Sequence, residues 1–265
     1  MWCSDPFLNS LKSFGYSVVR LPKTNIRPLQ VLTKRGKDLE RLGEITTLLV
    51  QGPAATLPTV KENQQAANIS GQRTGDLSFG VGLSILGSVI GAMGGSKLGL
   101  DAQYKQAKTV VFEFTDVLED SVEVLKLDQY LAGADIHPMS RYAAELLEVD
   151  EIYVTTATLK TKKLSVGAKQ SNGDSLQVDV PVIQQVVGGN VKVSAGTQAT
   201  SKVTYEGNMP LVFGFQAVRL FYDRSQYTRI EPLKPGAGMK ALERSPKDGS
   251  TRLVVESPFA RLSGE

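Results

Sequence analysis

The order of apolar and polar residues predicts a chain rich in β-strands, above all in its second half. Residues 152–161 are dense in β-branched side chains and partly alternate between apolar and polar, and residues 191–197 alternate again. A two-residue period is typical of a strand that buries one face. An Asn-Gly-Asp turn at 172–174 separates these two segments. Shorter apolar runs predict further strands at 16–21, 48–50, 110–114, 202–205 and 212–222.

Two segments show helical periodicity instead. At 5–14, Asp5 is the expected N-cap and Pro6 the first helical residue, and apolar side chains follow on one face. Residues 140–149 repeat this spacing, so a second helix is expected there. Residues 118–131 fit a strand or a helix, and the polar stretch 52–76 is expected to be mostly loop.

A run of twenty residues without charge, 77–96, stands out between Asp76 and Lys97. Its length is close to that of a helix that spans a bilayer. Its six glycines and four serines lower both apolarity and helix propensity. We therefore expect a buried or amphipathic element that is able to meet lipid if the fold opens.

The chain changes character after Tyr222. Residues 232–250 contain three prolines and three glycines with basic residues between them, which predicts an exposed linker open to proteases. Leu242 and Arg244 are candidate cleavage positions for two different protease classes. A short apolar tail follows, and it either docks on the main body or forms a last strand of the same domain. Its apolar residues are Leu253, Val254, Val255, Phe259 and Leu262.

Charge and cysteine content narrow the class of protein. The net charge of +3 over 265 residues does not argue for nucleic-acid binding. Residues 1–43 hold eight basic and three acidic side chains, however, and such a segment attracts anionic lipid headgroups. A single cysteine, Cys3, excludes an internal disulfide and fits a reducing compartment. No signal peptide is expected, because Asp5 and Lys12 interrupt any apolar run. With Trp2 and Phe7 beside it, Cys3 is a candidate for fatty acylation.

Catalytic patterns are weak throughout. The one histidine, His137, lies in a loop-like Ile-His-Pro context, and a Cys3–His137 thiol enzyme would need a terminus that is held rigidly. No phosphate-binding glycine loop and no Cys/His metal cluster is present in the sequence. The acidic residues Asp116, Glu119, Asp120 and Glu123 are expected to form a solvated face. We therefore expect no enzyme, no metal and no cofactor.

Several short blocks together resemble one known family. They are Cys3 followed by Asp5-Pro-Phe-Leu8, then Phe14-Gly-Tyr16, Leu21-Pro22, Ile26-Arg-Pro-Leu29 and the glycine-rich Leu83-Ser-Ile-Leu86. With two β-rich segments and an apolar tail behind a linker, the whole chain resembles the bacterial gasdermins. The resemblance implies an α+β fold with a twisted, largely antiparallel central sheet and surrounding helices, which converts to a membrane β-barrel on activation.

The same resemblance implies a function in bacterial antiphage defence. Residues 1–234 would be the pore-forming body, 235–250 a cleavable linker and 251–265 an autoinhibitory tail held by Leu253, Val255, Phe259 and Leu262. A caspase-like or other protease would release the tail of a cytoplasmic monomer. The body would then enter the inner membrane, oligomerise into a large pore and kill the cell. The resemblance also implies palmitoylation, for which only Cys3 is available.

Two membrane hairpins are expected, one within residues 77–115 and one within 152–205, because a bilayer admits strands only in a closed ring. Pore-facing polar side chains would include Lys160, Lys162, Lys192 and Lys202. Alternation also occurs in any half-buried strand of a water-soluble protein. A soluble, non-enzymatic binding or scaffold protein with a lipid-modified N-terminus therefore remains the alternative.

Overall fold

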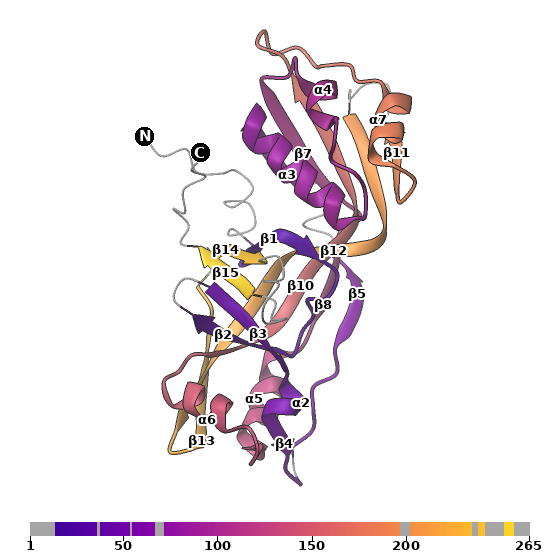
Figure 1. The fold of residues 1–265 in the computed structure, drawn as a ribbon. Helices are drawn as coiled ribbons and strands as arrows, with labels where there is room; N and C mark the ends of the chain where they lie inside the picture. The colour runs from indigo at the N-terminus through magenta and orange to yellow at the C-terminus, as the bar shows by residue number, and fades with distance from the viewer. Residues whose placement is uncertain are drawn as a thin grey trace.

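Two long antiparallel strands, β10 (Ile152–Lys169) and β12 (Lys202–Asp223), run through the whole molecule (Figure 1). The computed structural model describes residues 14–35, 38–53, 55–66, 72–196, 202–234, 238–241 and 252–256. The two strands pair from Tyr153 opposite Arg219 to Gly167 opposite Lys202. Three register shifts interrupt this ladder, and shifts of this kind bend strands. The pair thus connects lobes at the two ends of the molecule.

A closed ring of strands forms the middle of the fold. In spatial order it runs β12–β1–β14–β15–β3–β2–β10, and β10 returns to β12. All neighbours are antiparallel except β1 and β14. Side chains of five of these strands share one buried cluster that includes Val19, Leu32 and Phe215. The strands added here are β1 (Ser17–Lys23), β2 (Gln30–Arg35), β3 (Asp38–Glu44), β14 (Gly238–Ala241) and β15 (Arg252–Glu256).

The upper lobe in Figure 1 is a sheet with helices against one face. Its strand order is β11–β12–β10–β7–β6, and helix α3 lies across β7 while α7 lies beside β11. The new elements are β6 (Gln72–Ser78), α3 (Phe79–Ala92), α4 (Leu100–Tyr104), β7 (Thr109–Thr115), α7 (Val180–Val187) and β11 (Val191–Ala195).

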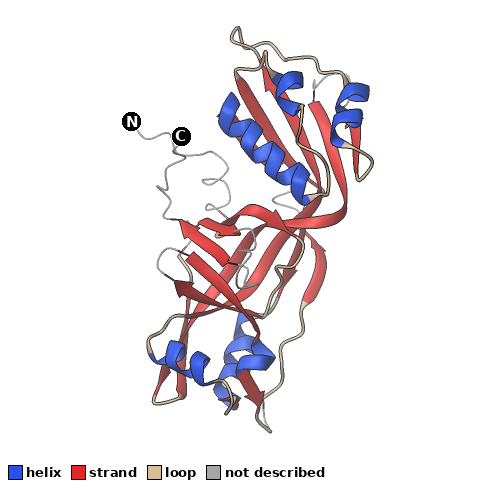
Figure 2. Ribbon diagram, in the orientation of Figure 1, coloured by secondary structure: helices blue, strands red, loops and turns tan. Residues whose placement is uncertain are grey.

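The lower lobe gathers the remaining helices around the other ends of β10 and β12, as Figure 2 shows in blue. Its core includes Leu127, Leu147 and Leu220. Between the lobes, β5 pairs with β8, which in turn pairs with β10. The elements are α2 (Ile45–Leu48), β4 (Leu49–Gln51), β5 (Lys61–Gln65), β8 (Leu118–Ser121), α5 (Val124–Gly133), β9 (Ala134–Ile136), α6 (Arg141–Glu148) and β13 (Gln226–Pro232).

The predicted fold class is confirmed, since the structure is α+β with a large, mostly antiparallel sheet. Strands β1, β4, β7 and β10 and helix α6 lie where periodicity places them. The Asn-Gly-Asp turn is also confirmed: Gly173 has φ +87°, and the Asp174 N–H donates to the Asn172 side-chain oxygen. Most of the uncharged run 77–96 forms α3, which is partly buried as expected.

Three expectations were wrong. The stretch 52–76 contains β5 and the first part of β6, because both find a strand to pair with. Residues 202–205 and 212–222 are one strand, β12, rather than two. The acidic group is not solvated throughout, because Asp120 in β8 is 7% exposed. Residues 238–241 of the predicted linker form β14, which pairs with β1 and β15.

Candidate functional site

We use the name arm sheet for β6, β7, β11, residues 163–169 of β10 and residues 202–207 of β12. Its two faces differ in chemistry. Ser165 lies opposite Glu113 on one side and Thr204 on the other, which makes a polar row across three strands. Directly opposed residues share a face. The next row, formed by Phe112, Val166 and Val203 in register, is apolar.

Helices cover the apolar face. Leu86 and Ile90 of α3 are fully buried in one cluster with Phe112, Val166 and Tyr205 of the strands. A glycine sets the closest approach, because a Cβ at Gly82 would lie 2.6 Å from the Cβ of Val110 in β7.

Met93, just after α3, makes a similar contact with the sheet, since a Cβ at Gly207 of β12 would lie 2.9 Å from its Cγ. Contacts of this kind require the small residue. The helix is therefore fitted to this sheet at two points rather than merely laid over it.

An ion pair crosses the polar face. The Lys202 ammonium of β12 contacts the Glu113 carboxylate of β7, and both side chains are 19% exposed. Strand β10 lies between them, and the lysine stem passes over Gly167, where a Cβ would lie in ordinary contact with the lysine Cγ at 3.5 Å. The Ser165 and Thr204 hydroxyls form a hydrogen bond of 2.8 Å beside it. The pair links strands from both predicted hairpins.

A buried hydroxyl pair fastens α4 to the apolar face. The Tyr104 and Tyr205 hydroxyl oxygens are 2.7 Å apart, and both residues are at most 1% exposed. Burial raises the pKa of Tyr104 to about 12, and burial also raises the pKa of Tyr205. The two buried hydroxyls thus share a hydrogen bond while both stay neutral.

Alkaline pH is expected to destabilise the protein through this pair. In the unfolded chain a tyrosine loses its proton near pH 10, whereas folded Tyr104 keeps it to about 12. The folded state then holds more protons, so the free energy of unfolding falls in this window, by up to about 1.4 kcal/mol per pH unit for one group. The free energy of unfolding, measured with urea, should fall less steeply above pH 10 for the Tyr104→Phe/Tyr205→Phe variant than for the parent. An equally steep fall would contradict this role.

A second buried ion pair lies between the lobes. Lys160 Nζ of β10 is 2.5 Å from Asp120 Oδ2 of β8, with side chains 12% and 10% exposed. The other carboxylate oxygen accepts the backbone N–H of Asn63 at 2.8 Å. Next to it, the buried Tyr16 donates its hydroxyl hydrogen to Glu119 Oε2 at 2.5 Å. The contacts of Asp120 thus join β5, β8 and β10.

The family follows from comparison with known proteins. Residues 19–228 match the model of the Bacterial Gasdermin Family. The chain is 62% identical to "Gasdermin bGSDM" of a Desulfuromonadales bacterium over 265 residues, which is the full length of both chains. The chain belongs to the bacterial gasdermin family. Gasdermins are pore-forming proteins rather than enzymes, so membership assigns this chain to a class that forms oligomeric pores and contacts membrane lipid.

Two further comparisons agree with this gasdermin assignment. "Gasdermin bGSDM" of Lysobacter enzymogenes is 44% identical over 237 residues, 88% of this chain and 87% of the relative. A solved bacterial gasdermin from Bradyrhizobium tropiciagri has a TM-score of 0.59 at 13% identity and covers 86% of this chain and 90% of that one. At this identity the structural match shows the shared fold.

Most predicted site residues of this gasdermin lie outside the described residues. These are Cys3, Leu242, Arg244, Phe259 and Leu262, and their roles stay predictions. Leu253 and Val255 lie in β15, opposite Leu39 of β3 and Met239 of β14, respectively. This pairing is expected both for a tail that docks on the body and for a last strand of the same domain, so it does not separate the two alternatives. The division into body, linker and tail therefore also stays a prediction.

The four predicted pore-facing lysines separate into two kinds. Lys160 and Lys202 are held in the ion pairs described above. Lys162 and Lys192 are exposed to solvent. Lys192 lies opposite Glu206, which lies opposite Lys163, so these three share the polar face of the arm sheet.

Nothing in the described part of this gasdermin is arranged for catalysis. His137 Nδ1 accepts the Met139 N–H at 3.2 Å within a turn. No group of three or more potential metal-binding side chains occurs among the described residues. Within the same residues, none of the helices has the length and apolarity required to cross a membrane.

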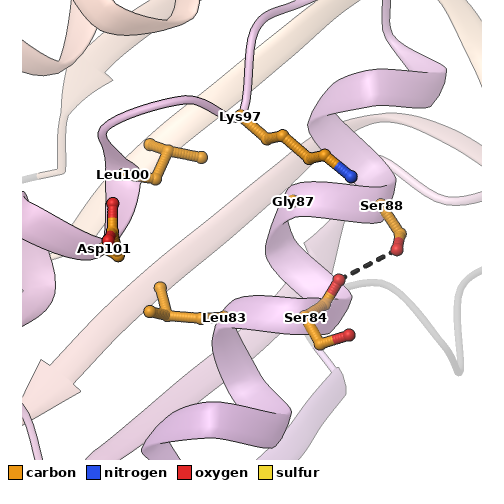
Figure 3. A pocket seen from close by; sticks show the side chains of 7 residues that line it. All are labelled: Leu83, Ser84, Gly87, Ser88, Lys97, Leu100 and Asp101. Atoms are coloured by element: carbon orange, nitrogen blue, oxygen red, sulfur yellow. Dashed lines mark hydrogen bonds between the residues drawn. The ribbon is translucent and has the colours of Figure 1, made fainter.

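A small hollow lies between α3 and α4 (Figure 3). It holds about 200 Å³ and is lined by Leu83, Ser84, Gly87, Ser88, Lys97, Leu100 and Asp101. Ligand pockets are usually larger and better enclosed. The Lys97 stem crosses it, with Cβ 3.5 Å from the place of a Cβ at Gly87. The hollow therefore separates two covering elements of the arm sheet and is not a ligand site.

Sequence reasoning missed the hydroxyl pair that fastens α4 to the arm sheet and the ion pair that links β7 to β12. Tyr104 and Tyr205 are 101 positions apart, and Glu113 and Lys202 are 89 apart. Only the alternation around 191–205 gave a signal, since it correctly puts Val203 and Tyr205 on one face.

Proposed function

We propose that this gasdermin is an autoinhibited pore-forming protein of bacterial antiphage defence. Proteolytic removal of the C-terminal tail triggers insertion into the inner membrane, assembly of a large homo-oligomeric pore and death of the cell. The intact protein is a cytoplasmic monomer, and its partners are a caspase-like or other activating protease, membrane lipids and other copies of itself.

One observation carries the proposal: the arm sheet has one polar and one apolar face, and helices cover only the apolar one. If α3, α4 and α7 leave, the face with Phe112, Val166 and Val203 becomes available to lipid, while the face with Glu113 and Ser165 remains suited to water. Strands with this alternation can line an aqueous pore in a bilayer. Segments 77–115 and 152–205 would supply the two hairpins.

The position of the tail supports its role as the switch. Strand β15 pairs with both β14 and β3 and so completes the ring of strands in the middle of the fold. The candidate cleavage residues Leu242 and Arg244 lie between β14 and β15 in the chain. A cut there would remove the covalent link between β15 and the rest of the body. Loss of β15 would leave the edges of β14 and β3 unpaired. The exposed backbone N–H and C=O groups of these edges would then favour pairing with other strands.

Palmitoylation of Cys3 would assist insertion. One acyl chain contributes about 0.8 kcal/mol per buried CH₂ yet anchors a protein only marginally. The acyl group would therefore strengthen an encounter that the released body makes with lipid, without fixing the intact chain to the membrane.

Dye release from liposomes tests the proposal. A chain ending at Arg244 is expected to empty dye-loaded vesicles of inner-membrane lipid composition, whereas the intact chain leaves them sealed. Cys3→Ala in the truncated chain should slow release, provided that the parent carries the acyl group by intact-mass analysis. Sealed vesicles with the acylated, truncated chain would refute the pore-forming switch.

A further inference from the structure

Strand β11 ends the arm sheet, and its outer edge carries backbone groups that a further strand could use. Within the part of the chain that the structure describes, β11 pairs with β12 alone among strands. The groups in question are the carbonyl oxygen of Val191 and the N–H of Val193. A neighbouring strand binds an edge through such a pair of groups on alternate residues.

The side chain of Gln184 in α7 occupies both groups. The Val193 N–H donates to Gln184 Oε1 at 2.7 Å, and Gln184 Nε2 donates to the Val191 carbonyl oxygen at 2.9 Å. A carboxamide has the same donor and acceptor as a peptide group. Gln184 thus bonds to β11 as a residue of an adjacent strand would.

Both N–H groups of the Gln184 amide donate hydrogen bonds, and the helix that carries the residue is packed on the sheet. The second hydrogen of Gln184 Nε2 is donated to the Gly188 carbonyl oxygen at 2.9 Å. Helix α7 is anchored on the sheet by Ile183 and Val187, at most 1% exposed, and capped by Asp179, whose side chain accepts the Val182 N–H. The amide is therefore positioned by a packed helix rather than by a loose side chain.

We propose that Gln184 guards the edge of β11 and prevents this strand from pairing with a second copy of the chain. Covering an edge with a helix is a known means of preventing edge-to-edge association. Here one amide blocks the groups that such association needs. The inference rests on the proposed function and adds a restraint on self-assembly that lies inside the body, apart from the tail.

A second copy is the fitting occupant because the arm sheet has two unlike terminal strands. Strand β6 ends the sheet on the far side and pairs with β7 alone among the described strands. The β11 edge of one copy can therefore meet the β6 edge of the next. Head-to-tail contacts of this kind repeat from copy to copy and generate rings when the rotation closes.

The test uses Gln184→Met in the full chain, because methionine keeps the length and helix propensity of glutamine and lacks its amide. Gln185→Met, at the exposed neighbouring position, is the matched control. Hydrogen exchange reports on the Val193 amide, and sedimentation velocity reports on self-association. We expect Val193 to exchange about fivefold to tenfold faster in Gln184→Met only. Oligomers should appear at a concentration roughly tenfold lower than in the parent.

Two results would overturn the proposal. Unchanged exchange at Val193 would show that the amide does not protect the edge. Faster exchange with unchanged self-association would show that the freed edge does not recruit a second copy. Because both measurements use the intact chain in solution, they decide the role of Gln184 even if the truncated parent fails to release dye from vesicles.

Discussion

Replacing Asp120 with asparagine is expected to lower the free energy of unfolding by about 3–5 kcal/mol. The Lys160 side chain is 12% exposed, and its ammonium group contacts the Asp120 carboxylate at 2.5 Å. An amide is neutral, so the substitution leaves a positive charge at a nearly buried position without its counter-charge. Removing one partner of a buried pair costs far more than the pair itself contributes. Urea unfolding followed by circular dichroism measures the loss.

Two variants make this result specific. Glu231→Gln removes a carboxylate from the Arg229 pair, whose side chains are 59% and 54% exposed, and should cost less than about 1 kcal/mol. Asp120→Leu combined with Lys160→Met removes both charges and should recover most of the stability. If Asp120→Asn costs no more than Glu231→Gln, the burial of the pair has no energetic consequence.

Gly82→Ala is expected to destabilise the intact fold by about 1–3 kcal/mol, although alanine is the better helix former. The added Cβ would lie 2.6 Å from the Cβ of Val110, so α3 must move away from β7. Under the proposed function, a displaced α3 uncovers the apolar face. The truncated Gly82→Ala chain should therefore release dye faster than the truncated parent, while thermal unfolding of the intact variant begins at lower temperature.

Gly80→Ala provides the matched control on the same helix. A Cβ at Gly80 meets nothing within 4 Å, so only the gain in helix propensity acts, and stability should rise by about 0.5–1 kcal/mol. If the two substitutions change the stability in opposite directions, the loss at Gly82 arises from its contact with β7. Equal stabilisation by both substitutions would show that the helix adjusts without cost.

The strands were the most predictable part of the fold. Residues 152–161 indicated a strand through their β-branched side chains, although residues 152–159 prove to be buried on both faces. Residues 191–195 indicated a strand through alternation, which correctly puts Val191 and Val193 on the buried face. Strand β5 had no such signal, because Lys61–Gln65 is polar throughout and becomes a strand by pairing with β8. Pairing energy from a distant segment does not appear in local periodicity.

The candidate site was predictable in its segments and not in its contacts. The sequence places an uncharged run beside two β-rich stretches, and these became α3 and the arm sheet. It could not show that Gln184 bonds to β11, because a glutamine on a short helix is ordinary in composition.

The sequence also gave no sign that Lys202 of β12 reaches Glu113 of β7 across β10. Such contacts depend on which strands become neighbours in the sheet, and that choice is made among segments far apart in the chain.

By itself, the sequence determined the strand-rich class, the main strands and the absence of recognisable catalytic patterns, since periodicity and residue chemistry are local properties. The resemblance of several short blocks added the family, which the comparisons confirmed. Only the tertiary structure decided that helices cover one face of the arm sheet, that ion pairs join Lys202 to Glu113 and Lys160 to Asp120, and that an amide closes the β11 edge. Each of these features needs two or more distant segments to lie side by side. Burial there strengthens the charge pairs and hydrogen bonds that the segments form.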